Sequence, residues 1–310
     1  MNAPAVTTQP AVFYGHGSPM NTLEANRHTE AWRRSGAMGP RPRAILAISA
    51  HWYVGETAVT AMARPRTIHD FYGFPAELHA FDYPAPGDPA LAERVRALLA
   101  PLPVRADADW GLDHGTWSVL AHVHPQADVP IVQLSLDARR GPAFHHELGR
   151  RLAVLRDEGV RIVGSGNAVH HLGRLARRPD APPHDWALAF EAHVRDCVLR
   201  DEVAPLIDYE GFGNAARLSV PTPEHYLPML VVLGARRRDD RATILTEGVE
   251  LGSIGMLSCA RDPAAAGSSA RRPATSPTPS CVRRRREPAR RTSSRCRRAA
   301  ASREGQRSRA

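Results

Sequence analysis

The chain has 310 residues, 43% of them hydrophobic, which is enough for one large or two small domains with an ample core. Its apolar runs are shorter than the roughly 18 residues of a membrane span, and the first ten residues lack the basic and apolar regions of a secretory signal. The four cysteines are far apart and form no C-x-x-C pair, which argues against a disulfide framework and favours a reducing cytoplasm.

Charge divides the chain into two parts. All 41 basic residues are arginine, and the net charge is +9. Residues 261–310 contain 15 arginines and three acidic residues, whereas residues 1–260 contain 26 arginines and 29 acidic residues. The excess positive charge therefore says nothing about a partner of residues 1–260.

The arginine-rich segment, residues 261–310, has almost no large apolar side chains. It cannot bury enough surface to offset the entropy of ordering, so we expect a disordered tail after a folded domain of residues 1–260. An arm that binds nucleic acid is the alternative. We expect no nucleic-acid partner, because no aromatic residues interleave with the arginines.

Residues 1–260 alternate between strand-like and helix-like segments. Ala11–Tyr14 and Ala44–Ala50 are apolar runs typical of strands covered on both faces, and Asp88–Leu99 opens with a capping Asp followed by Pro. Pro65–Pro86, with four prolines and several aromatic residues, is predicted to be an ordered loop. We further predict strands at Val129–Leu134, Val160–Gly164 and Met229–Gly234, and helices at Pro142–Glu158 and Asp185–Arg200. This alternation predicts a single α/β domain with a central parallel or mixed sheet flanked by helices.

Three of the 15 histidines stand where a predicted strand stops. His16 follows AVFYG between two glycines, His51 follows AILAISA, and His170 follows VRIVGSGNAV. Ligand sites of open α/β sheets lie outside the carboxyl ends of the strands, so these imidazoles are expected to converge. A site rich in histidine suits zinc, copper, iron or nickel, and the glycines beside His16 would let backbone and ligand come close to a metal. Taken singly, each histidine is more often a hydrogen-bonded structural residue.

Two further histidines are candidates for the same site. His114 again has a glycine beside it, in LDHGTW, and His225 precedes the predicted strand Met229–Gly234. In the aromatic loop His69 is a candidate for substrate contact. Phe71 and Trp117 are suited to stack on an aromatic ring, although an ordinary core role is equally consistent with their types.

Seven motifs occur in one order along the chain. They are GHGSPM (15–20), SAHW (49–52), TIHDFYGFP (67–75), YPAPG (83–87), LDHGTW (112–117), SGNAVH (165–170) and TPEHYLP (222–228). In this order they resemble the class III extradiol ring-cleavage dioxygenases of the 4,5-DOPA dioxygenase branch. The resemblance runs from about Val12 to Ser258, and the basic tail departs from it.

The resemblance implies roles for particular residues. His16, His51 and His225 match the metal ligands, with Glu224 as the alternative to His225. His170 matches a fourth ligand in zinc-filled members, whereas in related enzymes the histidine of that segment is the acid/base. His114 matches a second candidate for proton transfer.

The implied reaction is extradiol cleavage of a DOPA-like catechol by O₂, with Fe(II) as the working metal and a semialdehyde, a seco-DOPA, as the product. Zn(II) bound in its place would lack the accessible redox change that this reaction requires. The alternative is a zinc-dependent hydrolase of a small amide or ester, in which the same histidines hold an activated water.

Overall fold

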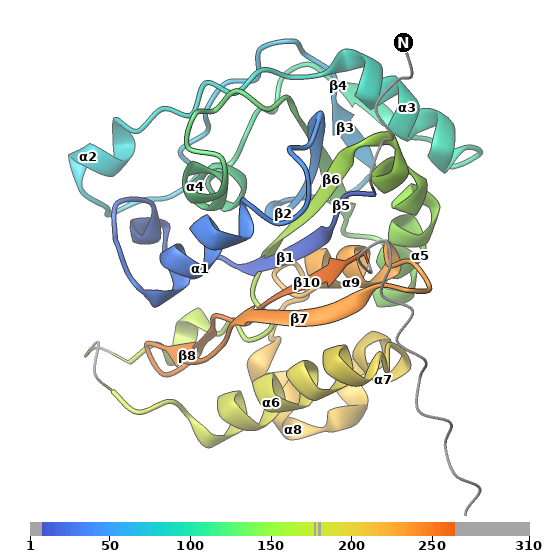
Figure 1. Cartoon of the computed structure of the whole chain (residues 1–310). Coiled ribbons are helices and arrows are strands. Elements are labelled where there is room, and N and C mark those ends of the chain that lie inside the picture. Colours follow the sequence, from blue (N-terminus) through green and yellow to red (C-terminus); the bar gives the residue numbers. More distant parts are fainter. Residues whose placement is uncertain (1–7, 177, 179–180, 264–310) are drawn as a thin grey trace, which may run out of the picture. The chain divides into compact units, whose positions relative to one another are not determined.

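An eight-stranded mixed sheet forms the centre of the computed structural model, which describes residues 8–176, 178 and 181–263 (Figure 1). The strand order is β4-β3-β5-β2-β6-β1-β10-β7, and the four central strands β5, β2, β6 and β1 are mutually parallel. The strands are β1 (Ala11–Gly15), β2 (Ala44–Val54), β3 (Ala58–Thr60), β4 (Arg105–Asp107), β5 (Ile131–Asp137), β6 (Val160–Gly166), β7 (Arg241–Thr246) and β10 (Ser258–Asp262). A separate two-stranded hairpin pairs β8 (Val249–Glu250) with β9 (Ile254–Gly255).

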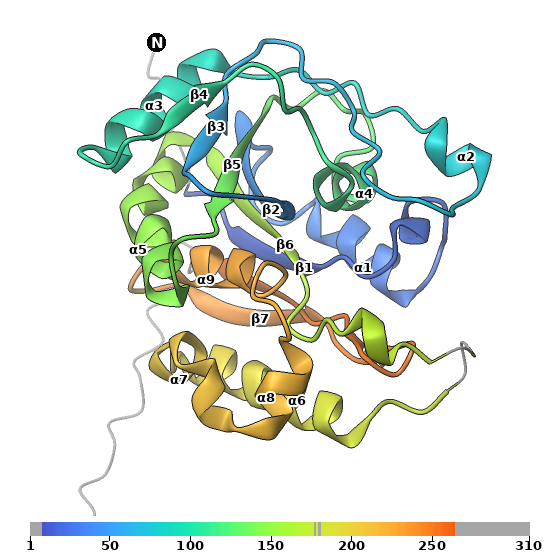
Figure 2. The same cartoon turned by 180° about the vertical axis from the view of Figure 1, so that it is seen from behind.

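Helices cover both faces of the sheet (Figures 1 and 2). On one face lie α3 (Pro89–Leu99), α5 (Pro142–Leu152) and α9 (Leu227–Gly234), and on the other α1 (Arg27–Ser35) and α4 (His114–Val123). The group α6 (Asp185–Arg200), α7 (Ala204–Ile207) and α8 (Asn214–Ser219) lies beside β7, and α2 (Ala76–His79) interrupts the long loop that follows β3. The predicted α/β domain, a mixed sheet between helices, is confirmed.

Several elements form where the sequence predicts them. The Asp88 side chain caps α3 by accepting a hydrogen bond from the Leu91 amide at 3.0 Å. Helix α6 has the predicted bounds, and β6 begins at the predicted Val160. The predicted helix from Pro142 to Glu158 is divided into α5 and a 3-10 turn from Ala153 to Glu158.

The predicted strand Met229–Gly234 is wrong, because this segment lies within helix α9. Every residue of α9 is buried, and the helix contacts β1, β2, β6 and α5. A helix that is apolar on all sides has no amphipathic period, so a short apolar run cannot be told from a buried strand by its pattern. Pro228 in the first turn is a helix-start signal that the pattern contains.

The C-terminal strand β10 lies between β1 and β7 and ends at Asp262, two residues beyond the predicted end of the folded domain. The arginine-rich segment expected to be disordered lies, from residue 264 onward, outside the described residues. Among the helices of the described residues, none combines the length and the apolar character that crossing a membrane requires.

Candidate metal centre

Three histidines from separate parts of the chain meet at one place. His16 directly follows β1, His51 lies in β2, and His225 precedes α9, and one ring nitrogen of each lies within 4.8 Å of the others. The Nε2 atoms of His16 and His51 are 3.4 Å apart. Two nitrogens that bind one ion at about 2.1 Å in tetrahedral or octahedral geometry lie roughly 3.0–3.4 Å apart, so the residues present fit a divalent metal.

The glycines beside His16 allow another segment of the chain, at Met256 and Leu257, to pack closely against them. A Cβ atom on Gly15 would lie 2.7 Å from the backbone carbon of Met256 and 2.8 Å from the Leu257 oxygen. Gly17 has a φ of +62°, which favours glycine, and packs against the Met256 side chain. These glycines therefore have a packing role, because they allow Met256 and Leu257 to lie directly against the His16 turn.

His51 lies at an irregularity of β2. The pairing of β2 with β5 shifts register between Ile48 and Tyr53, and His51 lies inside this interval. Irregularities of this kind bend a strand and redirect a side chain, and they are frequent beside active sites. The predicted strand ends at Ala50, one residue too early to include His51.

A side-chain oxygen lies within 3.3 Å of the Nδ1 atom of each of these imidazoles. Ser165 Oγ lies 2.9 Å from His16 Nδ1, an Asp70 oxygen lies 3.3 Å from His51 Nδ1, and a Glu224 oxygen lies 3.2 Å from His225 Nδ1. Such partners of a ligand histidine fix its ring orientation and its tautomer. The Nε2 atoms are thereby left for a metal.

Burial keeps these imidazoles neutral. Desolvation, followed by repulsion from neighbouring imidazoles, holds the pKa of His16 and of His225 well below 6.5 and lowers that of His51 to about 3. Metal binding requires the neutral form of histidine, so the cluster does not need to release protons at neutral pH to accept a metal.

His170 lies beside His225 and not within the group of three. The two rings are stacked, with centroids 3.4 Å apart and planes 9° apart. His170, Glu224 and His225 form a second group whose ligand atoms lie within 4.8 Å of one another. Burial, the largest effect, lowers the pKa of His170 to about 4. Glu224 is thus near enough to be an alternative ligand, but it already contacts His225.

His114 opens helix α4 and lies against His51, with ring centroids 3.8 Å apart. Its Nδ1 atom lies 2.9 Å from an oxygen of Asp70, which also contacts His51. Burial alone would raise the pKa of Asp70, but the hydrogen bonds and charge interactions with His114, and the charge interaction with His51, lower it to about 2. The Asp70 carboxylate is therefore ionised at neutral pH.

The aromatic loop contributes Phe71 to the site. The buried Phe71 ring meets His114 edge to face, with centroids 5.5 Å apart, and a flat apolar wall of this kind suits an aromatic ligand. Trp117 is fully buried, stacks on Phe81 and donates a hydrogen bond from Nε1 to the Ile68 carbonyl. His69 lies 2.8 Å from the Phe81 carbonyl and packs on Phe71 and Trp117, so both hold the loop behind Phe71.

Asp70 and Ser165 are the residues of the site that sequence reasoning does not single out. Both stand inside motifs of the resemblance, TIHDFYGFP and SGNAVH, which is the available signal. Nothing in the spacing says that Asp70 reaches His51 and His114, because both are distant from it along the chain.

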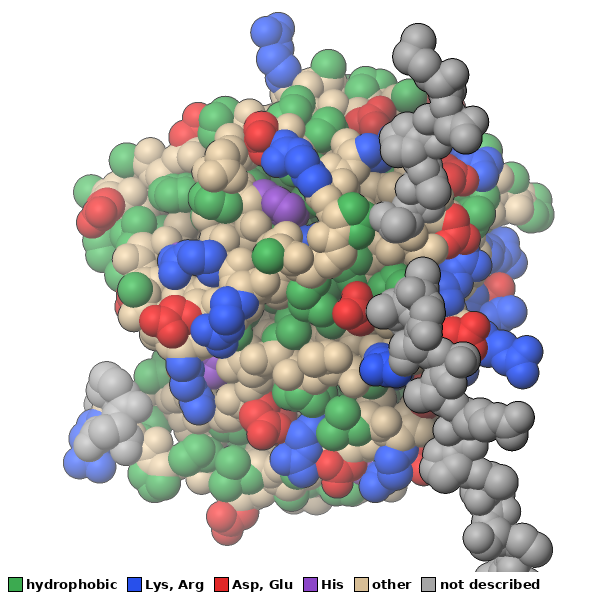
Figure 3. Space-filling view, in the orientation of Figure 1, with side chains coloured by type: hydrophobic (Ala, Val, Ile, Leu, Met, Phe, Trp, Pro, Cys, Tyr) green, Lys and Arg blue, Asp and Glu red, His purple; other side chains and the backbone are tan. Residues whose placement is uncertain are grey.

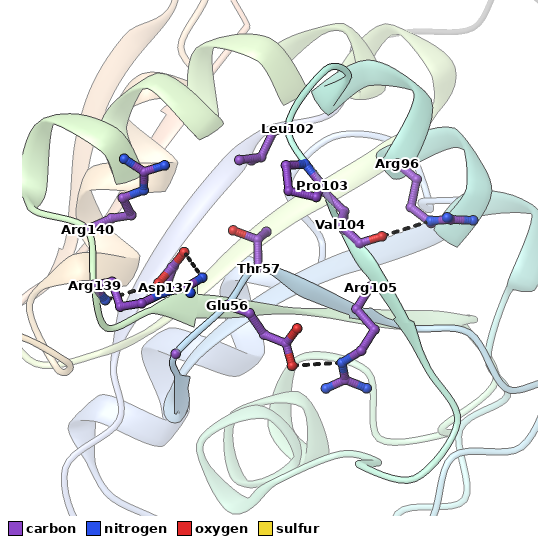
Figure 4. A pocket seen from close by; sticks show the side chains of 11 residues that line it. Glu56, Thr57, Arg96, Leu102, Pro103, Val104, Arg105, Asp137, Arg139 and Arg140 are labelled. Atoms are coloured by element: carbon purple, nitrogen blue, oxygen red, sulfur yellow. Dashed lines mark hydrogen bonds and ion pairs between the residues drawn. The ribbon is translucent and has the colours of Figure 1, made fainter.

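A cleft of about 660 Å³ lies elsewhere, lined by none of the candidate site residues (Figure 4). In this cleft Arg105 pairs with Glu56 at 2.8 Å, and Arg139 pairs with Asp137 at 3.1 Å. Among the described residues, none of the groups that could hold a metal ion lines this cleft, so the histidine cluster is the stronger candidate for the chemistry.

Comparison with known proteins agrees with the motifs and the geometry. Residues 10–260 match the family described as the catalytic LigB subunit of aromatic ring-opening dioxygenase. The chain is 50% identical over 256 residues to a 4,5-DOPA dioxygenase extradiol of Escherichia coli K12, covering 81% of this chain and 94% of that protein. It is 37% identical over 242 residues to a protein of the same name from Beta vulgaris, covering 75% of this chain and 89% of that protein.

A solved structure supports the same assignment. The fold matches the crystal structure of an uncharacterized protein from Escherichia coli K12 with a TM-score of 0.71 and 46% identity, covering 81% of this chain and 99% of that one. The chain therefore belongs to the LigB family of aromatic ring-opening dioxygenases, the extradiol enzymes that its seven motifs predict.

Proposed function

We propose that this protein cleaves the ring of a DOPA-like catechol with O₂ in extradiol fashion, giving a seco-DOPA semialdehyde, with Fe(II) as the working metal. The observation that carries the proposal is the meeting of His16, His51 and His225 within 4.8 Å in a chain 50% identical to a 4,5-DOPA dioxygenase. Two buried, free cysteines, Cys197 and Cys259, support a reducing, cytoplasmic location.

His16, His51 and His225 would hold the metal, with His170 beside His225 as the candidate fourth ligand. When bound, Fe(II) supplies Lewis acidity toward the catechol oxygens and the redox change that Zn(II) lacks. A zinc hydrolase is the less favoured reading, because the described activity of the family is ring opening.

The remaining residues bind the catechol and move its protons. Phe71 is placed to contact the ring, because it packs on His114 at the edge of the cluster. An Asp70 oxygen lies 2.9 Å from Nδ1 of His114, and this favours a proton on Nδ1 and leaves the Nε2 lone pair to accept a hydroxyl proton. His170, whose pKa burial lowers to about 4, is the second candidate for this proton.

Two variants of the iron-loaded protein test these roles. We expect His51→Ala to lose its equivalent of iron and all oxygen uptake with DOPA, because one of three ligands is removed. His114→Ala should keep the iron and lose turnover by roughly 10²–10⁴-fold, the usual contribution of a general base. Iron content and oxygen consumption measure the two effects. Full iron in His51→Ala would contradict the ligand assignment.

The wild-type protein provides the control for the metal. Reconstituted with Fe(II), it should consume oxygen and give a yellow product with DOPA, and reconstituted with Zn(II) it should do neither. Hydrolysis of an amide or ester by the zinc form without oxygen would instead support the hydrolase.

A further inference from the structure

One carboxylate contacts two histidines of the candidate site. An oxygen of Asp70 lies 2.9 Å from His114 Nδ1, and its other oxygen lies 3.3 Å from His51 Nδ1. The first oxygen also accepts a hydrogen bond from the His114 backbone amide at 2.9 Å. Asp70 thus touches one proposed metal ligand and one proposed acid/base residue at once.

The loop that carries Asp70 is anchored by contacts that do not involve this carboxylate. The Ile68 amide donates to the Leu112 carbonyl at 2.7 Å, and Trp117 Nε1 donates to the Ile68 carbonyl at 2.8 Å. Thr67 Oγ1 donates to Asp82 at 2.6 Å and accepts from the Tyr83 amide at 3.0 Å. Because the loop is held in place on both sides, the Asp70 side chain is free to act on the imidazoles.

We propose that Asp70 is a positioning residue that fixes the tautomers of His51 and His114 together. Both contacts are ion-pair contacts, and an ionised carboxylate can only accept a proton, so its position favours a proton on each Nδ1. The Nε2 of His51 is then a lone pair for the metal, and the Nε2 of His114 is a lone pair for the catechol proton. The role at His114 rests on the proposed function, whereas the role at His51 requires only that a metal binds.

The other two supporting oxygens each serve one histidine. Ser165 Oγ contacts His16 Nδ1 at 2.9 Å and donates its own proton to the Gly115 carbonyl, so it accepts from His16. Glu224 contacts His225. Loss of either should weaken one ligand, whereas loss of the Asp70 carboxylate should disturb metal binding and proton transfer together.

The test compares Asp70→Asn with two matched variants. Asparagine has the same shape, but its amide nitrogen donates, so it can keep only one of the two tautomers. We expect Asp70→Asn to lower the Zn²⁺ affinity of the metal-free protein roughly 10- to 100-fold, as other partners of ligand histidines do. In the iron form we expect turnover at saturating metal to fall roughly 100-fold or more.

Ser165→Ala and Thr67→Val separate this role from general structural support. Ser165→Ala should lower Zn²⁺ affinity but leave the ¹⁵N signals of His114 unchanged in the zinc form. Thr67→Val removes a loop anchor without touching either imidazole, and it should keep Zn²⁺ affinity and turnover within about threefold. In Asp70→Asn, the ¹⁵N shifts should report a changed tautomer at His51 or His114.

Two results would overturn the proposal. One is an Asp70→Asn protein with wild-type Zn²⁺ affinity and unchanged histidine shifts. The other is a Thr67→Val protein that loses as much Zn²⁺ affinity as Asp70→Asn, since Asp70 would then act only as part of the loop scaffold. If the wild-type iron form consumes no oxygen with DOPA, the proposed function fails, but the zinc titration and the ¹⁵N shifts still decide the role of Asp70.

Discussion

Glu191 of helix α6 is a buried carboxylate outside the candidate site. It is 5% exposed, and its two oxygens accept hydrogen bonds from the Gly248 and Leu257 amides, each at 3.0 Å. Burial raises the pKa of Glu191 from 4.5 to about 7, against the lowering effect of these bonds; the nearby Glu247 raises it further, and Arg27 opposes. Glu191 joins α6 to the segment that lies against the His16 turn.

A raised carboxyl pKa gives a defined dependence of stability on pH. Between pH 4.5 and 7 the folded protein binds more protons at Glu191 than the unfolded chain, so the free energy of unfolding from this group falls as pH rises. A shift of this size corresponds to at most about 3.5 kcal/mol across the window. We expect Glu191→Gln to lose this contribution, because glutamine does not titrate.

Urea unfolding of both proteins at several pH values between 4.5 and 8 measures the effect. The difference between their free energies of unfolding should change in favour of Glu191→Gln as the pH rises. A difference that is constant over this range would show that Glu191 has an ordinary pKa.

At the scale of elements, helices α5 and α9 pack through backbone contact. A Cβ atom on Gly234 would lie 2.0 Å from the His146 carbonyl oxygen, and one on Gly149 would lie 2.0 Å from the Val231 carbonyl oxygen. No side chain fits at either position unless the helices move apart. Since only Tyr226 separates His225 from α9, the placement of this helix also places a proposed metal ligand.

We expect Gly234→Ala to lower the free energy of unfolding by about 1–3 kcal/mol or more, because the methyl group forces α5 and α9 apart. Gly55→Ala is the matched control, because its Cβ meets nothing within 4 Å, and it should stay within about 0.5 kcal/mol of wild type. Denaturant unfolding measures both variants. Equal free energies of unfolding for the two variants would mean that α5 and α9 can move apart without loss of stability.

The same helix marks the limit of what the sequence predicts. Caps and periodicity place α3 and α6, and β-branched apolar runs place β2 and β6, because local signals decide those elements. Helix α9 is missed because burial on all sides removes the period. Its identity depends on α5 and the sheet, which are distant along the chain.

For the candidate site, the sequence predicts the histidines but not all of the residues that contact them. Strand ends point to His16, His51 and His170. Their local sequence makes His114 and His225 further candidates, and the order of the motifs implies a role for each. The bridge from Asp70 to two histidines is not predictable, because it depends on how a long loop folds back over β2 and α4. Sequence pattern predicts which residues carry chemistry better than it predicts the residues that hold them.

At the scale of the whole molecule, the excess of positive charge lies in a different part of the chain from the fold that the structure describes. On the face drawn in Figure 3, arginine and acidic side chains are interspersed over the described residues. Residues 264–310 contain 14 arginines and two acidic residues, so the strong positive charge lies outside the described domain.

The position of β10 decides where a shortened chain can end. Arg261 is buried, and its guanidinium lies 3.1 Å from Asp201 and donates to the Val198 carbonyl at 3.2 Å.

A chain ending at Pro263 should therefore keep the metal affinity, the oxygen uptake with DOPA and the thermal midpoint of the full chain, because it retains all of β10. It should no longer be retained on a cation exchanger, since the excess of arginine is removed. A chain ending at Ser258 is the contrasting variant: it loses most of a strand between β1 and β7 and the buried Arg261, and we expect it to unfold. Thermal unfolding and iron-dependent oxygen uptake measure both chains, and a large loss of activity in the chain ending at Pro263 would assign the arginine-rich segment a part in ring cleavage.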